Sequence, residues 1–176
     1  MKQKTVRLFF ALWPSDEVRN QLSIAARNIQ LSRPGRLIRK VNLHITLHFI
    51  GNTGVENANC LQQVAGRVIT QPFSLKIDKV GQFKRAAIVW VGCRSVPREL
   101  DELHRQLGEV ISTCDFEPEK RNYRPHVTLF RKAALGEADP GITPIEWQVD
   151  SFSLISSEQD RQGVIYRELQ RYPFNH

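Results

Sequence analysis

The stretch 42–51 has the sequence Asn-Leu-His-Ile-Thr-Leu-His-Phe-Ile-Gly, and its centre is the pair His44 and Thr46. The same His-x-Thr pattern returns at His126 and Thr128. Apolar and polar residues alternate around both pairs, as in a β-strand with one face in the core. Side chains two positions apart on a strand point to the same face. The pattern therefore predicts two strands, each of which projects a histidine and a threonine together.

The same alternation assigns every side chain of the first strand to a face. It predicts that the aliphatic residues and Phe49 enter the core, and that His48 shares a face with His44 and Thr46. A histidine can exchange a proton near neutral pH, and a threonine hydroxyl can donate a hydrogen bond to a phosphate oxygen. Two such pairs that face one cleft would supply a general acid and a general base.

The two motifs, Asn-Leu-His-Ile-Thr-Leu-His-Phe-Ile-Gly and Arg-Pro-His-Val-Thr-Leu-Phe-Arg, resemble the paired motifs of the two-histidine phosphoesterases. They are most similar to the RNA 2′,3′-cyclic phosphodiesterases of bacteria and archaea, the LigT or ThpR proteins. Residues 7–12, 80–83 and the strand 86–91 also resemble that group, and the resemblance extends from about residue 6 to residue 172. It implies an α+β fold with two pseudo-symmetric lobes of antiparallel sheet and flanking helices around a central cleft. We expect residues 1–176 to form this single two-lobed domain.

The resemblance implies hydrolysis of RNA 2′,3′-cyclic phosphate ends to a 2′-phosphate, without a metal ion or other cofactor. His126 would act as the base on water, and His44 as the acid to the leaving 3′ oxygen. Thr46 and Thr128 would hold the phosphate oxygens, which positions the phosphate and stabilises its charge. The sequence symmetry of the motifs leaves open which histidine is the acid.

Two further residues are candidates for substrate binding. Arg131 resembles the basic residue that follows the second motif in the family and could clamp a phosphate bidentately. Strict alternation places Arg131 opposite His126, so this role requires the strand to end or twist near Phe130. Phe9 could stack on a nucleobase, and the alternative for Phe9 is a place in the core.

The expected partner is an RNA that ends in a 2′,3′-cyclic phosphate, such as a tRNA half, or a related nucleotide. We expect a cytoplasmic monomer with no membrane contact. The alternatives are a non-catalytic RNA or nucleotide-binding module, a phosphodiesterase for a small cyclic nucleotide, and the reverse reaction, 2′–5′ ligation of RNA. A metal site built from His44, His48 and His126 is a further alternative, although zinc sites commonly add carboxylates or thiolates, which neither motif contains.

Composition agrees with a phosphate-bearing ligand. The chain has 176 residues, a formal net charge of +7 and 41% hydrophobic residues, which suits one domain that attracts polyanions. Basic residues gather before both motifs and after the second; they are Arg33, Arg36, Arg39, Lys40, Lys120, Arg121, Arg124, Arg131 and Lys132. No apolar run approaches the roughly 18 residues of a membrane span, and the N-terminus shows no signal peptide. Cys60, Cys93 and Cys114 are not spaced like the ligands of a metal site. We therefore expect them to be reduced thiols.

Periodicity and turn residues predict the remaining elements. Helices are expected after an N-cap at Ser15 and over 55–70 and 98–114. His104, on the last of these, is expected at the surface. Strands are expected over 5–13, 42–50, 73–80, 86–93, 124–132, 146–156 and 164–170. The strands 73–80 and 86–93 are expected to form a hairpin, with a loop over 133–144 and a hairpin tip over 157–163.

Overall fold

The structure is a computed structural model, and it describes residues 5–161 and 163–174. Within these residues the α-helices are α1 (Asp16–Asn28), α2 (Val55–Ala65) and α3 (Arg98–Ile111), with short 3-10 turns at η1 (Lys40–Asn42) and η2 (Ser112–Cys114). The strands are β1 (Val6–Leu12), β2 (Leu31–Arg33), β3 (Arg36–Leu37), β4 (Ile45–Thr53), β5 (Phe73–Ile77), β6 (Lys79–Phe83), β7 (Ile88–Gly92), β8 (His126–Arg131), β9 (Ala134–Leu135), β10 (Ile145–Val149), β11 (Ser151–Asp160) and β12 (Gly163–Pro173).

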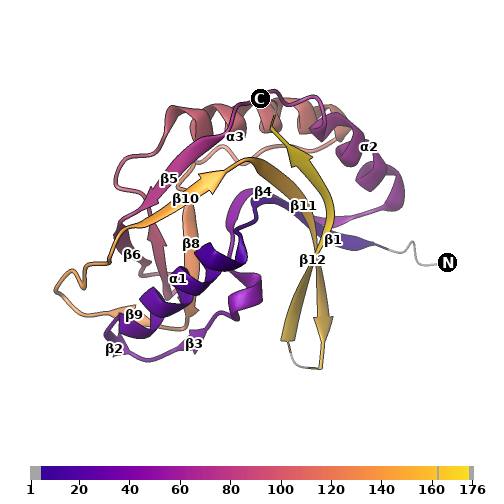
Figure 1. Cartoon of the computed structure of the whole chain (residues 1–176). Helices are drawn as coiled ribbons and strands as arrows, with labels where there is room; N and C mark the ends of the chain where they lie inside the picture. The colour runs from indigo at the N-terminus through magenta and orange to yellow at the C-terminus, as the bar shows by residue number, and fades with distance from the viewer. Residues whose placement is uncertain (1–4, 162, 175–176) are drawn as a thin grey trace.

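One antiparallel sheet carries both motif strands at its centre. Its strand order is β12-β11-β1-β4-β8-β7-β6, and β3 also pairs with β8. In the described chain, β4 and β8 pair only at Ile45 and Val127. Each motif strand therefore has an extensive ladder with its outer neighbour, β1 or β7, and a minimal one with the other motif strand. The β11–β12 hairpin extends well beyond β4 (Figure 1).

The three helices begin where the sequence predicts them, but α2 ends at Ala65 and not near residue 70. Ser15 caps α1, because its Oγ accepts a hydrogen bond from the backbone N–H of Val18 at 3.3 Å. The apolar stripe of α3 is fully buried at Leu100, Leu103, Leu107 and Ile111. Helices α2 and α3 lie side by side in Figure 1. None of the helices in the described ranges is long and apolar enough to cross a membrane.

Two predicted strands are each split between two sheets at an aspartate. The segment 73–80 divides at Asp78 into β5 and β6, and the segment 146–156 divides at Asp150 into β10 and β11. Strand β5 pairs with β10 in a separate two-stranded sheet, while β6 forms the hairpin with β7. The prediction that the segment 73–80 forms a hairpin with β7 was therefore wrong for the first half of that segment, β5. Alternation records which face is buried but not which strand lies alongside.

Short strands also occupy segments that were predicted to be irregular. β2 pairs with β9, and β3 pairs with β8, so the chain after α1 runs along the second motif strand. The predicted hairpin tip over 157–163 is largely strand, because β11 continues to Asp160 and β12 begins at Gly163. The short strand β3 and the longer hairpin of β11 and β12 thus extend the sheet on either side of the two motif strands.

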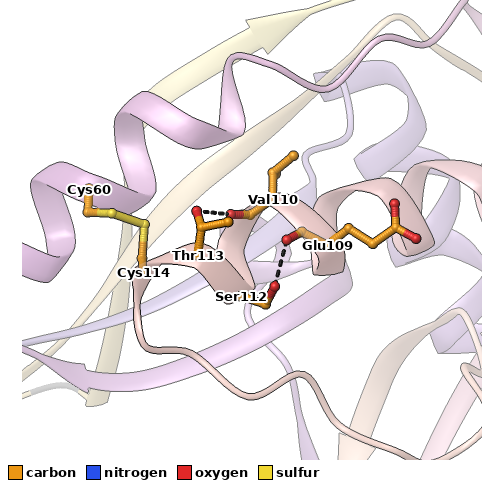
Figure 2. Close-up of a disulfide and its surroundings, with 6 residues drawn as sticks. All are labelled: Cys60, Glu109, Val110, Ser112, Thr113 and Cys114. Carbon is orange, nitrogen blue, oxygen red and sulfur yellow. Dashed lines mark hydrogen bonds between the residues drawn. A yellow bond between two sulfur atoms is a disulfide. The ribbon is translucent and has the colours of Figure 1, made fainter.

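Cys60 and Cys114 form a disulfide between α2 and η2, so the expectation of reduced thiols was wrong for these two residues. The packing of α2 against the end of α3 brings their Cα atoms to 5.9 Å, within the range that a disulfide spans. Figure 2 shows two further hydrogen bonds at the end of α3. The hydroxyls of Ser112 and Thr113 donate to the backbone carbonyls of Glu109 and Val110. Cys93 is free.

Candidate active site

A cleft of about 730 Å³ lies over the motif strands, and His44, Thr46, His126 and Thr128 all line it. Its walls come from β1, β4, β7, β8, the segment between β3 and η1, and the β11–β12 hairpin. A volume of this size accommodates a small organic ligand such as a nucleotide. The structure therefore brings together the four motif residues that lie far apart in the sequence.

A β-bulge in the first motif strand changes which residues face the cleft. Thr46 pairs with Ala11 of β1 and His48 pairs with the adjacent Phe10, which leaves Leu47 as an extra residue. A bulge reverses the alternation beyond it. His48 is consequently buried at 4% exposure, and Phe49 is 52% exposed and lines the cleft. The predicted places of His48 and Phe49 were both wrong for this reason.

The second motif strand has a bulge at the equivalent position. Thr128 pairs with Trp90 of β7 and Phe130 pairs with the adjacent Val89, so Leu129 is the extra residue. Leu129 and Phe130 are both buried, and Arg131 returns to the cleft face beside the motif. This bulge is the change of strand direction near Phe130 that Arg131 needs in order to face the cleft.

His44 is held in one orientation by its own strand. Its Nδ1 lies 2.7 Å from the carbonyl oxygen of Asn42, and its Nε2 lies 3.0 Å from the hydroxyl of Thr46. Because a carbonyl only accepts, Nδ1 carries the proton of the neutral ring, and Nε2 accepts from Thr46. Tyr166 and Phe9 pack against the ring with centroid distances of 5.3 and 4.9 Å.

His126 repeats this arrangement. Its Nδ1 lies 2.7 Å from the carbonyl oxygen of Arg124, two positions earlier in the chain, as Asn42 is for His44. This contact leaves Nε2 as the nitrogen available for proton transfer. The ring packs against the edge of Phe83 and lies 6.0 Å from the ring of Trp90. Both imidazoles are therefore oriented by a backbone carbonyl and confined by aromatic rings.

Both imidazoles are uncharged at neutral pH in the free protein. The pKa of His44 is lowered to about 4, mainly by burial, with a hydrogen bond to Asn42 that raises it and smaller contributions from His126 and Arg131 that lower it. Burial also lowers the pKa of His126, and Arg131 acts in the same direction. A bound phosphate would oppose these effects, because a nearby negative charge favours the protonated ring.

Four arginines line the cleft: Arg7, Arg36, Arg39 and Arg131. Arg36 and Arg131 are directly opposite each other on the paired strands β3 and β8. The sequence had singled out three of the four by their position near the motifs. Arg7 was missed because it lies on β1, whose place beside β4 is not evident from local sequence. Lys120 and Arg121, in contrast, do not line the cleft and pair with Glu117 and Glu119.

Phe9 and Phe49 both line the cleft but occupy different environments. Phe9 lines the cleft but is only 3% exposed, and it packs against His44 and Tyr166. Phe49 presents much more of its surface to the cleft, with the guanidinium of Arg7 4.9 Å from its ring centroid. Phe49 was missed because alternation assigned it to the core. A role for Phe9 in base stacking stays a prediction.

His48 and His104 do not join His44 and His126 in the cleft. His48 faces the helices, where it stacks on His104, so the alternative metal set of His44, His48 and His126 is divided between two faces of the sheet. In the part of the chain that the structure describes, no three His, Cys, Asp or Glu side chains gather to hold a metal. The expected surface position of His104 was right only in part, because its ring is partly exposed but lies between His48 and Tyr123.

A family model described as the 2′-5′ RNA ligase superfamily matches residues 14–161. The chain belongs to the 2′-5′ RNA ligase superfamily. Within this superfamily, the RNA 2′,3′-cyclic phosphodiesterase of Escherichia coli K12 is 33% identical over 168 residues, which cover 94% of this chain and 95% of the relative. The protein of the same name from Aeropyrum pernix is 29% identical over 152 residues, which cover 77% and 84%.

Solved structures confirm the predicted LigT-like α+β fold for this member of the superfamily. The crystal structure of E. coli LigT complexed with 3′-AMP superimposes with a TM-score of 0.89 at 31% identity, and covers 98% of this chain and 100% of that one. A second structure, described as a phosphoesterase, gives a TM-score of 0.91 at 30% identity with the same coverage. The resemblance that the two motifs suggested is therefore confirmed over nearly the whole chain.

Proposed function

We propose that this chain hydrolyses the 2′,3′-cyclic phosphate at the end of an RNA to a 2′-phosphate. The observation that carries the proposal is the pair of equivalent bulged strands, each of which supplies a histidine and a threonine to one arginine-lined cleft. Relatives across bacteria and archaea that are named RNA 2′,3′-cyclic phosphodiesterase support it. The site provides the groups that in-line displacement at phosphorus requires, a base, an acid and hydrogen-bond donors for the non-bridging oxygens.

In the proposed reaction, a water oxygen attacks phosphorus and gives its proton to Nε2 of His126. The bond between phosphorus and the 3′ oxygen breaks, and Nε2 of His44 donates a proton to that oxygen. The products are a 2′-phosphomonoester and a free 3′ hydroxyl. Thr46 and Thr128 donate hydrogen bonds to the phosphate oxygens, and Arg131 pairs with the negative charge.

The electrostatics place a condition on this assignment. The group with the lower pKa loses its proton first, and the pKa of His44 in the empty cleft lies at about 4. His44 can therefore act as the acid only when the bound phosphate raises its pKa. His44 thus acts as the acid, and His126 as the base, in the complex with bound substrate.

We further propose that the enzyme works as a cytoplasmic monomer on RNA ends, tRNA halves included, and requires no metal ion. The reverse reaction, 2′–5′ ligation, would use the same groups in the opposite direction. The Cys60–Cys114 disulfide is unusual for a reducing compartment. Free thiols counted after rapid alkylation of cells would test the location, since a cytoplasmic protein should show substantial reduction of this bond.

The deciding experiment uses an oligoribonucleotide that ends in a 2′,3′-cyclic phosphate, with excess EDTA, and separates products by phosphate position. The intact protein should yield the 2′-phosphate, and His44→Ala and His126→Ala should each abolish turnover while retaining the circular dichroism spectrum of the parent. A near-normal rate for His126→Ala would overturn the mechanism. Binding without turnover by the intact protein would instead favour a recognition module, and turnover of a cyclic mononucleotide alone would favour a small substrate.

A further inference from the structure

Three rings from three separate segments stack behind the first motif strand, on the face away from the cleft. His48 of β4 lies against His104 of α3 with a centroid distance of 4.1 Å and an interplanar angle of 16°. His104 in turn lies against Tyr123, in the segment before β8, at 3.9 Å and 11°. The stack therefore connects the motif strand, a helix and the approach to the second motif. None of these three rings lines the catalytic cleft.

Polar contacts tie this stack to the bulge in β4. The Tyr123 hydroxyl donates a hydrogen bond to the backbone carbonyl of Thr46 at 3.1 Å. The His104 ring lies between the ring of His48, the residue that follows the bulge, and the ring of Tyr123. His48 Nε2 donates to the backbone carbonyl of His104 at 2.8 Å, which fixes α3 against the strand. The contacts thus reach Thr46 and His48, the residues on either side of the bulge at Leu47.

The sequence of α3 is adapted to this contact at Gly108. A Cβ atom added there would lie 3.2 Å from Cε1 and 3.3 Å from Nε2 of His48. Glycine inside a helix costs about 1 kcal/mol relative to alanine. The helix therefore retains an unfavourable residue at the place where the His48 ring approaches its backbone.

Among the described residues, no such ring stack lies behind the second motif. The residue equivalent to His48 is Phe130, which is buried as an ordinary apolar side chain. A bulge interrupts the regular ladder and leaves local backbone groups that need other partners. In the first motif, Tyr123 supplies such a partner at Thr46.

We propose that Tyr123 and His104 are positioning residues that hold the Leu47 bulge and thereby fix Thr46 for phosphate binding. This inference rests on the proposed function and extends it, because it assigns the direction of one phosphate-binding hydroxyl to a stack outside the cleft. The effect is confined to one wall, so Thr128 should be independent of the stack. Misplacement of a binding group by about 1 Å is enough to slow catalysis by roughly 100-fold.

The test is a double-mutant cycle between Tyr123→Phe and Thr46→Val, measured with the cyclic-phosphate oligoribonucleotide. Tyr123→Phe keeps the ring stack and removes only the hydroxyl, so the fold is preserved. We expect it to lower kcat by roughly 10-fold, with KM little changed. In the Thr46→Val background the same substitution should have almost no further effect, because the group that it positions is already absent.

The matched control is the same substitution in the Thr128→Val background, where the full roughly 10-fold loss should remain. Equal losses in both backgrounds, or no loss in the parent, would overturn the inference. His104→Phe retains a ring that can stack and should keep more activity than His104→Ala, whereas equal activities would exclude a role for the ring stack. Absence of turnover in the unmodified protein would count against the proposed function, and the cycle is interpreted only when that turnover is present.

Discussion

Leu47 and Leu129 are the extra residues of two β-bulges that occupy the same place in the two motif strands. Each directly follows a motif threonine, and each lies beside a break in the register with the outer strand, β1 or β7. In both strands the next residue turns into the core and the one after it turns toward the cleft. The two walls of the cleft therefore correspond residue by residue, with Phe49 on one wall where Arg131 stands on the other.

The histidine that acts as the acid can be identified with a substrate whose leaving group needs no protonation. A cyclic phosphorothiolate that carries sulfur in place of the 3′ oxygen has a leaving group that departs without protonation. His44→Ala should therefore regain a large part of its activity on this substrate, while His126→Ala should remain inactive. Comparison of single-turnover rates on the oxygen and sulfur substrates provides the measurement. Rescue of His126→Ala alone would reverse the two roles.

Arg131 should influence both substrate affinity and the protonation of His126. Arg131→Gln removes a charge-assisted contact and should raise KM roughly 10- to 100-fold, which corresponds to about 1.5–3 kcal/mol. Because Arg131 lowers the pKa of His126, its removal lets that pKa rise. The acidic limb of the kcat/KM profile should then move to higher pH, since a base with a raised pKa remains protonated longer.

Arg131→Lys is the matched control for this prediction. It keeps the positive charge but loses the bidentate geometry. It should therefore raise KM and leave the acidic limb close to its original position. An unchanged limb in Arg131→Gln would show that Arg131 does not act on the catalytic base.

Phe9 and Phe49 should respond differently to substitution. Phe49→Ala removes an exposed ring from the cleft and should raise KM for the oligoribonucleotide, since base stacking contributes about 1–3 kcal/mol. Its melting temperature should hardly change. Phe9→Ala removes a buried ring and should lower stability by about 3–5 kcal/mol. Thermal unfolding and steady-state kinetics on both variants would reveal the opposite pattern if Phe9 were the stacking residue.

The disulfide should contribute strongly to stability. It closes a segment with a sequence separation of 54 residues, for which loop-closure entropy predicts roughly 4 kcal/mol. Cys60→Ser, or reduction by dithiothreitol, should therefore lower the denaturation midpoint, and reductant should have no further effect on Cys60→Ser. Cys93→Ser serves as the control, because Cys93 is free and its loss removes no covalent link.

The predicted helices and the motif residues could be derived from sequence because their signals are local. Ser15 is a capping residue that lies directly before its helix, and the stripe of α3 repeats at helical spacing. His44 and His126 were found because a repeated pattern of two polar residues stands out in an apolar strand. These features need no knowledge of which segments lie side by side.

The errors arose where a distant neighbour decides the outcome. The bulge at Leu47 depends on the register with β1, so strict alternation placed His48 and Phe49 on the wrong faces. In the second strand the adjacent apolar residues Leu129 and Phe130 gave a visible sign of the bulge, which the polar His48 concealed in the first. The Cys60–Cys114 disulfide depended likewise on helix packing that no spacing rule records.

The pairing of β4 with β8 has a consequence for catalysis. Among the described residues the two motif strands share one backbone pair, Ile45 with Val127, whereas each has a long ladder on its outer side. The backbone of each wall is therefore held mainly by its own outer strand, β1 or β7. A substitution that shifts β1 or β7 is expected to displace one imidazole and to have less effect on the other.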